Sequence, residues 1–339
     1  MKGVLLVNLG TPDSPSTSDV RKYLRQFLSD PRVIDINPLA RFLLVNFIIA
    51  PFRAPKSAKL YKEVWTEKGS PLLVYSQSLA HLVQQQLGKK YHVELAMRYQ
   101  QPSIDQALLK LKHCTDITIL PLFPQYSSAC NTSVGENVMS IISKWQIIPS
   151  IKFINSFYDD AQFLNAWIQV AKQFELSHFD HILFSFHGLP QRQLVKADDA
   201  NHCLQTKNCC DTITEKNKFC YSANCHATAH TIAARLGIAK SNYTICYQSR
   251  LGRDPWVQPY TDQVLKQMAA EGKKNLLVFA PAFVADCLET IHEIGTEYDE
   301  LFKEHGGQKV TLVPSLNDSP AWVDAVCNLI TEPKHELSL

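Results

Sequence analysis

The stretch His181–Pro190, HILFSFHGLP, carries the pattern that decides the fold. An apolar run of strand length, rich in β-branched and aromatic residues, ends in a tight turn at Gly188 and Pro190. We predict a buried strand here. Runs of the same kind recur along the chain at 3–8, 92–97, 116–122, 151–154, 243–247, 275–280 and 309–313. The sequence therefore predicts four strands in each half of the chain.

Segments with helical periodicity separate these strands, for example Ile104–Leu111 and Ala161–Phe174. Strands that alternate with helices form parallel sheets. The sequence thus predicts an α/β protein of two similar domains, 1–160 and 161–330, with a polar tail at 331–339. Each domain should hold a four-stranded parallel sheet flanked by helices.

Composition and missing motifs exclude several classes of function. The 339 residues carry a formal net charge of +2 with no long run of one sign, which argues against nucleic-acid binding. Neither G-x-G-x-x-G nor G-x-x-x-x-G-K-[ST] occurs, which argues against a nucleotide site. The apolar run after Lys2 is too short for a signal peptide core, and no cleavage site of small residues follows it. We therefore expect a cytoplasmic protein.

The unusual residues of this sequence come directly after the predicted strands. In open α/β sheets, ligands bind outside the carboxyl ends of the strands. We therefore expect one ligand cleft between the two domains. The segments concerned are NLGTPDSP (8–15), PLFPQYSS (121–128), SFHGLP (185–190), YQSRLGRDPW (247–256) and APAFVADCLETIHEI (280–294).

His187 is the first candidate for chemistry in this cleft. The turn after it should project the imidazole from the edge of the sheet. An imidazole in that place can accept a proton near neutral pH or ligate a metal. A purely structural histidine is the alternative interpretation.

A line of carboxylates is the second candidate. On an α-helix, the spacings 3, 4, 4 and 3 place the acidic residues at 286, 289, 293, 297 and 300 in one stripe. The stripe is either a solvated helix face or a path for protons and hard divalent cations. Few basic residues offset the repulsion within it, which favours function for Asp286, Glu289 and Glu293.

Arginine and aromatic residues at the strand ends predict the kind of ligand. Arg98 and Tyr99 follow the second strand, and Arg250 and Arg253 follow the sixth. The guanidinium fork suits carboxylates, and aromatic rings supply flat apolar surface. Together they describe a pocket for a large, flat, apolar acid. The aromatic residues are Phe123, Tyr126, Trp256 and Phe283.

Two further segments have alternative interpretations. Residues 39–55 form either a buried helix or an apolar lip, with Arg53 and Lys56 on its rim, that dips into one membrane leaflet. Five of the ten cysteines fall between 203 and 225. They are bare thiols, zinc ligands or ligands of a [2Fe–2S] cluster on four of the five. These cysteines are Cys203, Cys209, Cys210, Cys220 and Cys225.

The motifs SFHGLP, PLFPQYS, YQSRLGRDPW and ADCLETIHEI resemble the signatures of the ferrochelatase family, and the resemblance extends over roughly residues 2–330. It implies two Rossmann-like halves of the chelatase type around a porphyrin. It also implies insertion of ferrous iron into that porphyrin, the terminal step of haem biosynthesis, with release of two protons. Porphyrin, ferrous iron and a membrane surface are then the expected partners.

The resemblance also implies roles for individual residues. The active-site histidine of the family matches His187, its essential glutamate matches Glu289, and the next acidic residue matches Glu293. We expect His187 and Glu289 to contact the substrate iron, and a tight pocket to hold the porphyrin puckered. The residues expected to bind substrate are Leu9, Arg98, Tyr99, Tyr126 and Trp256.

Substrate and cofactor stay open at this level. Leu9, at a position where relatives carry Met or Tyr, and the lip at 39–55 favour protoporphyrin IX. Coproporphyrin III, a sirohydrochlorin chelatase and a non-catalytic porphyrin carrier are the alternatives. Many family members with a [2Fe–2S] cluster hold it near the C-terminus, where this chain has only Cys327. Some bacterial relatives are similar to this chain in the internal cysteine-rich region.

Overall fold

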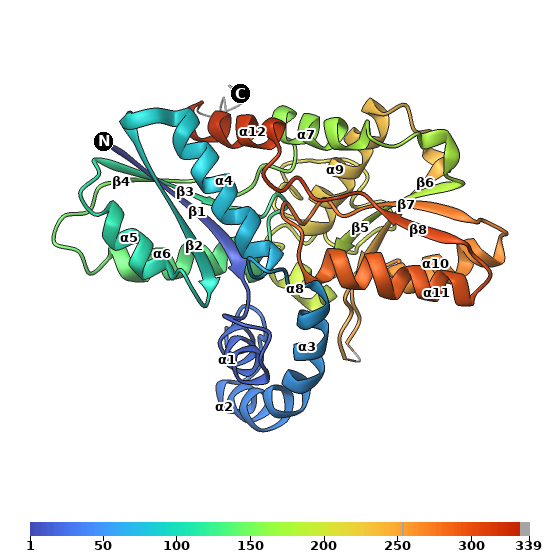
Figure 1. Cartoon of the computed structure of the whole chain (residues 1–339), viewed down its shortest axis with the longest axis horizontal. Helices are drawn as coiled ribbons and strands as arrows, with labels where there is room; N and C mark the ends of the chain where they lie inside the picture. The colour runs from blue at the N-terminus through green and yellow to red at the C-terminus, as the bar shows by residue number, and fades with distance from the viewer. Residues whose placement is uncertain (253, 333–339) are drawn as a thin grey trace. The chain divides into compact units, whose positions relative to one another are not determined.

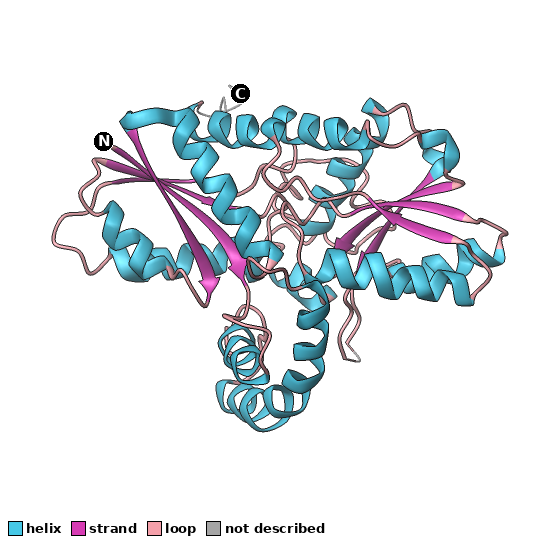
Figure 2. Cartoon of the chain, in the orientation of Figure 1, coloured by secondary structure: helices cyan, strands magenta, loops and turns pink. Residues whose placement is uncertain are grey.

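The computed structural model describes residues 1–252 and 254–332 (Figures 1 and 2). Its strands form two four-stranded parallel sheets with the orders β2-β1-β3-β4 and β6-β5-β7-β8. The predicted α/β class and all eight predicted strands are confirmed. The strands are β1 (Lys2–Gly10), β2 (Tyr91–Tyr99), β3 (Asp116–Pro121), β4 (Ser150–Phe153), β5 (His181–His187), β6 (Tyr243–Gln248), β7 (Asn275–Phe279) and β8 (Lys309–Leu312).

The chain divides into two compact units, each built on one sheet. The N-terminal unit comprises Met1–Phe123, Ser128–Ser156 and the described chain from Trp322 onward. The C-terminal unit comprises Pro124–Ser127 and Phe157–Ala321. The last part of α12 (Pro320–Thr331) is therefore assigned to the N-terminal unit. The segment predicted as a tail, 331–339, is described only as far as Glu332.

The sheet of the N-terminal unit is covered on both faces. Alternate residues of β1 point to opposite faces. Leu5 and Val7 pack with α5 (Ile104–Leu111) and α6 (Ser133–Ile142) in one apolar core. On the other face, the Asn8 amide donates to Ser76 Oγ of α4 (Pro71–Leu87), 3.0 Å away. Both faces of a parallel sheet are thus buried, as this class requires.

The sheet of the C-terminal unit is also packed on both sides. Its core on one face joins Leu183 of β5 with α10 (Thr261–Ala270) and α11 (Asp299–Glu304). The other face is aromatic, and the rings of Phe184 and Phe279 stack 5.1 Å apart. There the sheet meets α7 (Ala161–Ala171), because Trp167 lies 6.2 Å from Phe279. The remaining helices of this unit are η4 (Leu176–His178), α8 (Gln191–Lys196), α9 (Tyr221–Arg235) and η5 (Lys240–Asn242).

The stretch 39–55 is exposed rather than buried. It forms α2 (Pro38–Leu43), the π-helix η1 (Leu44–Ile49) and the start of α3 (Ala50–Val64). Val45 and Ala50 face inward, but six large apolar side chains face solvent: Leu39, Phe42, Leu43, Phe47, Ile48 and Phe52. We call these six residues the lip. Across 1–252 and 254–332, no helix is long and apolar enough to cross a bilayer.

The remaining elements of the N-terminal unit are short or flank the lip. α1 (Thr17–Leu28) is capped by Ser16, whose side chain accepts from the Asp19 N–H group. The Tyr23 ring of α1 meets Tyr61 of α3 edge-on, 6.4 Å away. α1 and α3 therefore support the lip as a helical pair. The other two elements are η2 (Gly88–Lys90) and the π-helical turn η3 (Ser128–Thr132).

The predicted acidic stripe is corrected by the structure. The segment Glu289–Tyr298 winds as a π-helix, η6, and not as an α-helix. Hydrogen bonds inside η6 accordingly join side chains five residues apart, as from Tyr298 to Glu293 and between His292 and Glu297. The wider turn breaks the single line of carboxylates that α-helical spacing predicted. Such π-helical segments are rare and frequently occur at functional sites.

Candidate active site

His187 is the last residue of β5, at the carboxyl end of the sheet. Its Nδ1 atom lies 2.7 Å from the carbonyl oxygen of Gly188. A carbonyl can only accept, so Nδ1 carries the proton and the Nε2 lone pair is free to take a proton or bind a metal. The main-chain carbonyl of His187 accepts from the Tyr221 hydroxyl at 2.7 Å, which fixes the backbone at this point.

Aromatic rings surround the imidazole of His187. The Trp256 and Phe283 rings lie 6.5 and 6.3 Å from it, centroid to centroid. Gly188 makes this packing possible, because a Cβ atom there would lie 2.9 Å from the Gln248 carbonyl and 3.1 Å from the Trp256 ring. The imidazole of His187 is therefore flanked by two flat aromatic rings.

Glu293 is held by four hydrogen bonds. Its carboxylate accepts from the Ser249 N–H group at 2.8 Å, the Ser249 hydroxyl, the Gln248 amide at 3.1 Å and the Tyr298 hydroxyl at 2.9 Å. Burial, and then the charge of Glu293, raise the pKa of Tyr298 well above its ordinary value, so Tyr298 stays a donor. These contacts tie η6 to the carboxyl end of β6.

Glu289 begins η6 and is half-buried. Its main-chain carbonyl accepts from the Gln248 amide at 3.0 Å. Its carboxylate lies near the Cys287 thiol, whose pKa is raised well above its ordinary value by burial and then by the Glu289 charge. Gln248, which ends β6, thus contacts both Glu289 and Glu293.

The other acidic residues of this segment have different surroundings. Asp286 precedes η6 and is buried, and its carboxylate accepts from Thr290 Oγ1 (3.1 Å), the Ser315 N–H group (3.2 Å) and the Asn317 amide (2.8 Å). These contacts fit a residue that anchors the start of η6. Glu297 and Glu300 are exposed. Of the predicted stripe, Glu289 and Glu293 remain beside the end of the sheet.

Arg98 and Tyr99 form a separate polar cluster in the N-terminal unit. The Arg98 guanidinium donates to Asp30 Oδ2 and Ser133 Oγ at 2.7 Å each, and it lies over the Tyr99 ring. The Tyr99 hydroxyl donates to the same Asp30 oxygen at 2.9 Å. Burial, and then the Asp30 charge, raise the pKa of Tyr99 well above its ordinary value. Asp30 thus fixes both residues that the sequence singled out.

Both residues line a basic cavity of about 950 Å³ in the N-terminal unit. Three more cations line it, namely Arg21, Lys22 and Arg25 of α1. Asp30 is its one acidic lining residue and is already paired with Arg98. The excess of positive charge suits an anionic ligand such as a carboxylate.

Comparison with known proteins identifies the family of this chain. The sequence model of the ferrochelatase family matches residues 1–334. A ferrochelatase of Legionella pneumophila (strain Paris) is 45% identical over 331 residues, covering 98% of this chain and 99% of that protein. A ferrochelatase of Coxiella burnetii (strain CbuG_Q212) is 43% identical over 331 residues, covering 96% and 92%. The chain belongs to the ferrochelatase family.

Solved structures at low identity support the fold. SirB from Bacillus subtilis with Fe³⁺ aligns with a TM-score of 0.55 at 10% identity, over 97% of this chain and 94% of that one. The sirohydrochlorin chelatase SirB from Bacillus subtilis subspecies spizizenii, in complex with cobalt, aligns with a TM-score of 0.53 at 11% identity, over 96% of this chain and 92% of that one.

As a ferrochelatase, this chain is an enzyme of the porphyrin metal chelatase class, and iron insertion into a porphyrin is its reaction.

Two further predicted substrate residues, Leu9 and Tyr126, lie in different units of the chain. Leu9 is half-buried near the end of β1, where its N–H group donates to the Asn8 side chain at 2.8 Å. Tyr126 belongs to the C-terminal unit, where its ring lies 5.3 Å from Phe219. Arg250 is exposed and stacks over Tyr260, and Arg253 lies outside the described residues.

Sequence reasoning missed several residues that position these candidate side chains within each unit. Gln248 stands inside the motif YQSRLGRDPW, but nothing in a single sequence shows that its amide reaches η6. Asp30 precedes Arg98 by 68 residues, so their ion pair is equally hidden. The basic lining of the cavity was visible as Arg21 and Arg25, which are four residues apart on one helix face.

Four of the five clustered cysteines are neighbours. Cys209 and Cys210 sulfurs lie 3.8 Å apart, and the Cys210 thiol donates to the Ser222 hydroxyl at 3.3 Å. Interaction with Cys203, and then with Cys210, lowers the pKa of Cys220 well below its ordinary value. Cys220 also occupies the N-cap position of α9, whose N–H groups favour a thiolate. Cys225 is fully buried, and burial raises the pKa of its thiol.

Proposed function

We propose that the chain inserts ferrous iron into protoporphyrin IX to form protohaem, with His187 as the group that receives a pyrrole proton or briefly ligates the iron. The observation that carries this proposal is the contact of His187 Nδ1 with the Gly188 carbonyl at 2.7 Å. This contact makes Nε2 the basic atom of the imidazole, and it directs Nε2 away from the strand.

Glu289 is the second group of the proposed reaction. Inserting a divalent ion releases two pyrrole protons, so a second acceptor beside His187 is needed. Glu289 is half-buried, and its neighbour Cys287 stays protonated and does not compete for protons, because the pKa of that thiol is raised. Glu293 continues the path from there, and its carboxylate is held by the hydroxyl groups of Ser249 and Tyr298, which donate to it.

The rings beside His187 supply the setting for a flat macrocycle. A planar porphyrin cannot present its lone pairs to a metal on one face. Trp256 and Phe283 offer rigid apolar surface against which the macrocycle can be held puckered. Binding energy from the apolar face of the porphyrin is then used to strain its centre.

Carboxylate recognition is assigned to the basic cavity of the N-terminal unit. Arg98 is held rigidly by Asp30 and Ser133, so binding costs it little side-chain entropy. Leu9 and the lip favour protoporphyrin over coproporphyrin III, which carries more carboxylates. Coproporphyrin III is the alternative substrate, and a non-catalytic carrier is the alternative function.

An anaerobic assay tests these roles. Purified protein is mixed with ferrous iron and protoporphyrin IX or, in parallel, coproporphyrin III, while porphyrin fluorescence and the Soret band are followed. We expect rapid metallation of protoporphyrin, and a loss of at least about 100-fold in kcat in His187→Ala and Glu289→Gln. Glu297→Gln, on an exposed carboxylate of the same helix, is the matched control and should keep normal turnover.

The other outcomes are informative. Faster metallation of coproporphyrin would keep the mechanism and change the substrate. Normal turnover in both variants would refute the roles of His187 and Glu289. Binding of either porphyrin without metallation would leave a carrier.

We further propose a [2Fe–2S] cluster on Cys203, Cys209, Cys210 and Cys220. Such clusters are bound by four thiolates. The Cys209 and Cys210 sulfurs lie 3.8 Å apart, and Cys203 and Cys210 interact with Cys220, whereas Cys225 is fully buried within α9. Asp198, which accepts from the Cys203 N–H group at 2.6 Å, would hold one end of the segment in place.

Absorption spectra and acid-labile sulfide test the cluster. We expect visible absorption and sulfide in protein purified anaerobically, and loss of both in Cys209→Ser and Cys220→Ser. Cys225→Ala should retain them, because this thiol is not among the proposed ligands. Colourless wild-type protein without sulfide would refute the assignment. So would a loss of absorption and sulfide in Cys225→Ala as large as the loss in Cys209→Ser and Cys220→Ser.

We also propose that the chain is cytoplasmic and attaches peripherally to the inner face of the cytoplasmic membrane through the lip. Phe42, Phe47 and Phe52 are 55%, 63% and 73% exposed, and Arg53 and Lys56 flank them with positive charge. Aromatic residues with a basic rim bind anionic interfaces.

Flotation with anionic phospholipid vesicles tests the lip. Wild-type protein should float, and Phe47→Ser with Phe52→Ser should stay at the bottom of the gradient. Ile147→Ser is the matched control, because Ile147 is an exposed apolar residue outside the lip. Equal flotation of all three proteins would refute the assignment.

A further inference from the structure

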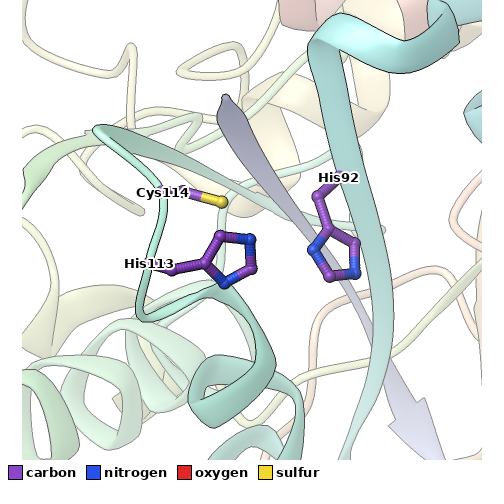
Figure 3. A group of neighbouring side chains, drawn as sticks. All are labelled: His92, His113 and Cys114. Atoms are coloured by element: carbon purple, nitrogen blue, oxygen red, sulfur yellow. The ribbon is translucent and has the colours of Figure 1, made fainter.

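Three metal-ligand side chains meet at the amino-terminal end of the first sheet. His92 is the second residue of β2, and His113 and Cys114 lie in the turn between α5 and β3. One ligand atom from each lies within 4.8 Å of the others. Figure 3 shows the two imidazoles facing each other, with the Cys114 sulfur pointing to the same side. None of the three belongs to the site of the proposed reaction.

His92 is prepared as a metal ligand by its own hydrogen bond. Its Nε2 atom lies 3.0 Å from Glu94 Oε1, and Glu94 is also paired with Lys110 at 3.0 Å. A carboxylate can only accept, so Nε2 carries the proton and Nδ1 holds the free lone pair. Metal-binding histidines are usually oriented by such a carboxylate on the other ring nitrogen.

The free nitrogen of His92 is buried. Among the described residues, Nδ1 has no hydrogen-bond partner and no access to solvent. A buried polar atom without a partner costs free energy, and such an atom in a native structure calls for a missing ligand or water. In Figure 3 the ring nitrogen of His92 that is bonded to Cγ, which is Nδ1, faces His113. The unsatisfied atom therefore points into the cluster.

The other two ligands complement His92. Cys114 is buried, and burial raises the pKa of its thiol, so the group is protonated in the absence of metal. His113 is exposed, and its ring lies 5.5 Å from that of His92, tilted by 41°. An exposed imidazole can turn to close the ligand set and leaves one coordination position open to solvent.

We propose that His92 Nδ1, Cys114 Sγ and one ring nitrogen of His113 bind a divalent transition-metal ion of the zinc class, with water as the fourth ligand. Two imidazoles and a thiolate are the donors that Zn²⁺ prefers in a tetrahedral site. Metal–ligand bonds of about 2.0–2.3 Å require the ligand atoms to approach by roughly 1 Å, which the exposed His113 can supply. Binding converts the Cys114 thiol to a thiolate and releases its proton to solvent.

The consequence of binding is local and structural. β2 is an edge strand of its sheet, and the ion would join it to the turn that leads into β3. His92 and Arg98 are separated by six residues of one strand, roughly 20 Å. Metal at this site should therefore stabilise the N-terminal unit without entering the reaction.

Cobalt titration of the full chain tests the proposal, because Co²⁺ reports a thiolate ligand by charge-transfer absorption in the near ultraviolet. The cysteine-rich segment is present in every sample, so the readout is the difference between variants. We expect wild-type protein to bind one more ion per chain than His113→Ala or Cys114→Ser, and part of the charge-transfer band to disappear in Cys114→Ser. Zn²⁺ should raise the unfolding temperature of wild type more than that of His113→Ala.

Two controls match the substituted residues. His81→Ala removes an exposed histidine of the same unit, and Cys327→Ser removes a buried thiol of the same unit. Both should bind metal as wild type does. Because His113 is exposed, its substitution should leave the metal-free protein folded. Equal stoichiometry and equal spectra in wild type, His113→Ala and Cys114→Ser would overturn the proposal.

Discussion

At the scale of single residues, Gly188 controls the position of the catalytic candidate. A Cβ atom at Gly188 would lie 2.9 Å from the Gln248 carbonyl and 3.1 Å from the Trp256 ring. Neither group is the end of a flexible side chain that could move aside. Gly188→Ala should therefore displace His187 or Trp256. We expect a loss of about 1–3 kcal/mol in the free energy of unfolding, and a fall in kcat for iron insertion. Urea unfolding and the anaerobic assay measure the two effects.

Gly295 provides a matched comparison in the same unit. A Cβ atom there would have its nearest neighbour, the Thr290 carbonyl, at 3.7 Å, which is an ordinary contact. Gly295→Ala should keep activity and lose little stability. If Gly188→Ala behaved in the same way, the close approach at Gly188 would not matter for His187.

At the scale of residues, the sequence can single out a candidate where local chemistry is enough. His187 could be singled out because the turn behind it lies in the same short motif. Gln248 and Asp30 could not, because each acts on residues 41–68 positions away along the chain. Their role follows from the sheet order, which brings distant strand ends together.

At the scale of elements, η6 depends on an anchor at its beginning. Asp286 accepts three hydrogen bonds, from Thr290, Ser315 and Asn317. Asp286→Ala would leave these donors unsatisfied in a buried place, so we expect a loss of about 2–4 kcal/mol in the free energy of unfolding. Thermal unfolding followed by circular dichroism measures it.

Carboxylates of the same segment serve as controls for that effect. Glu297 is exposed, so Glu297→Gln should change stability by less than about 0.5 kcal/mol. Glu289→Gln should abolish activity with the fold intact. Equal destabilisation by all three substitutions would mean that Asp286 has no special anchoring role.

The strands could be predicted because buried parallel strands appear in a sequence as short apolar runs, independently of their surroundings. The π-helix η6 could not be predicted in this way. Its sequence has the 3- and 4-residue spacings of an α-helix, and Gln248 and Ser249, which lie outside η6, bind Glu289 and Glu293 in the observed winding. Tertiary contacts therefore decide a winding that local pattern assigns otherwise.

At the scale of the whole molecule, the chain leaves its first unit and returns to it. Trp322 is fully buried and belongs to the N-terminal unit, although 165 residues of the C-terminal unit, Phe157–Ala321, precede it. Sequence periodicity predicts this last helix but carries no information on which sheet it covers. Two sheets of one topology could be predicted from the sequence, because four strands recur in each half.

The acid stability of the molecule should depend on histidines buried in the neutral form. Burial, and then the charge of His230, lower the pKa of His226 to about 4, and burial also lowers the pKa of His181 and His230. The unfolded chain binds a proton at each below about pH 6.5, whereas the folded chain does not. Stability should therefore fall as the pH drops from about 6.5 towards 4.

His226→Gln measures the part of this pH dependence of stability that comes from His226. Near pH 5 the depressed pKa of His226 costs the folded state ~2 kcal/mol relative to neutral pH. Unfolding midpoints at about pH 7.5 and 5 should consequently differ less in His226→Gln than in wild type. His178→Gln, on an exposed histidine of the same unit, should keep the full difference. If His226→Gln kept it as well, His226 would be free to take up its proton in the folded protein, and the acid sensitivity would have to arise from His181 and His230.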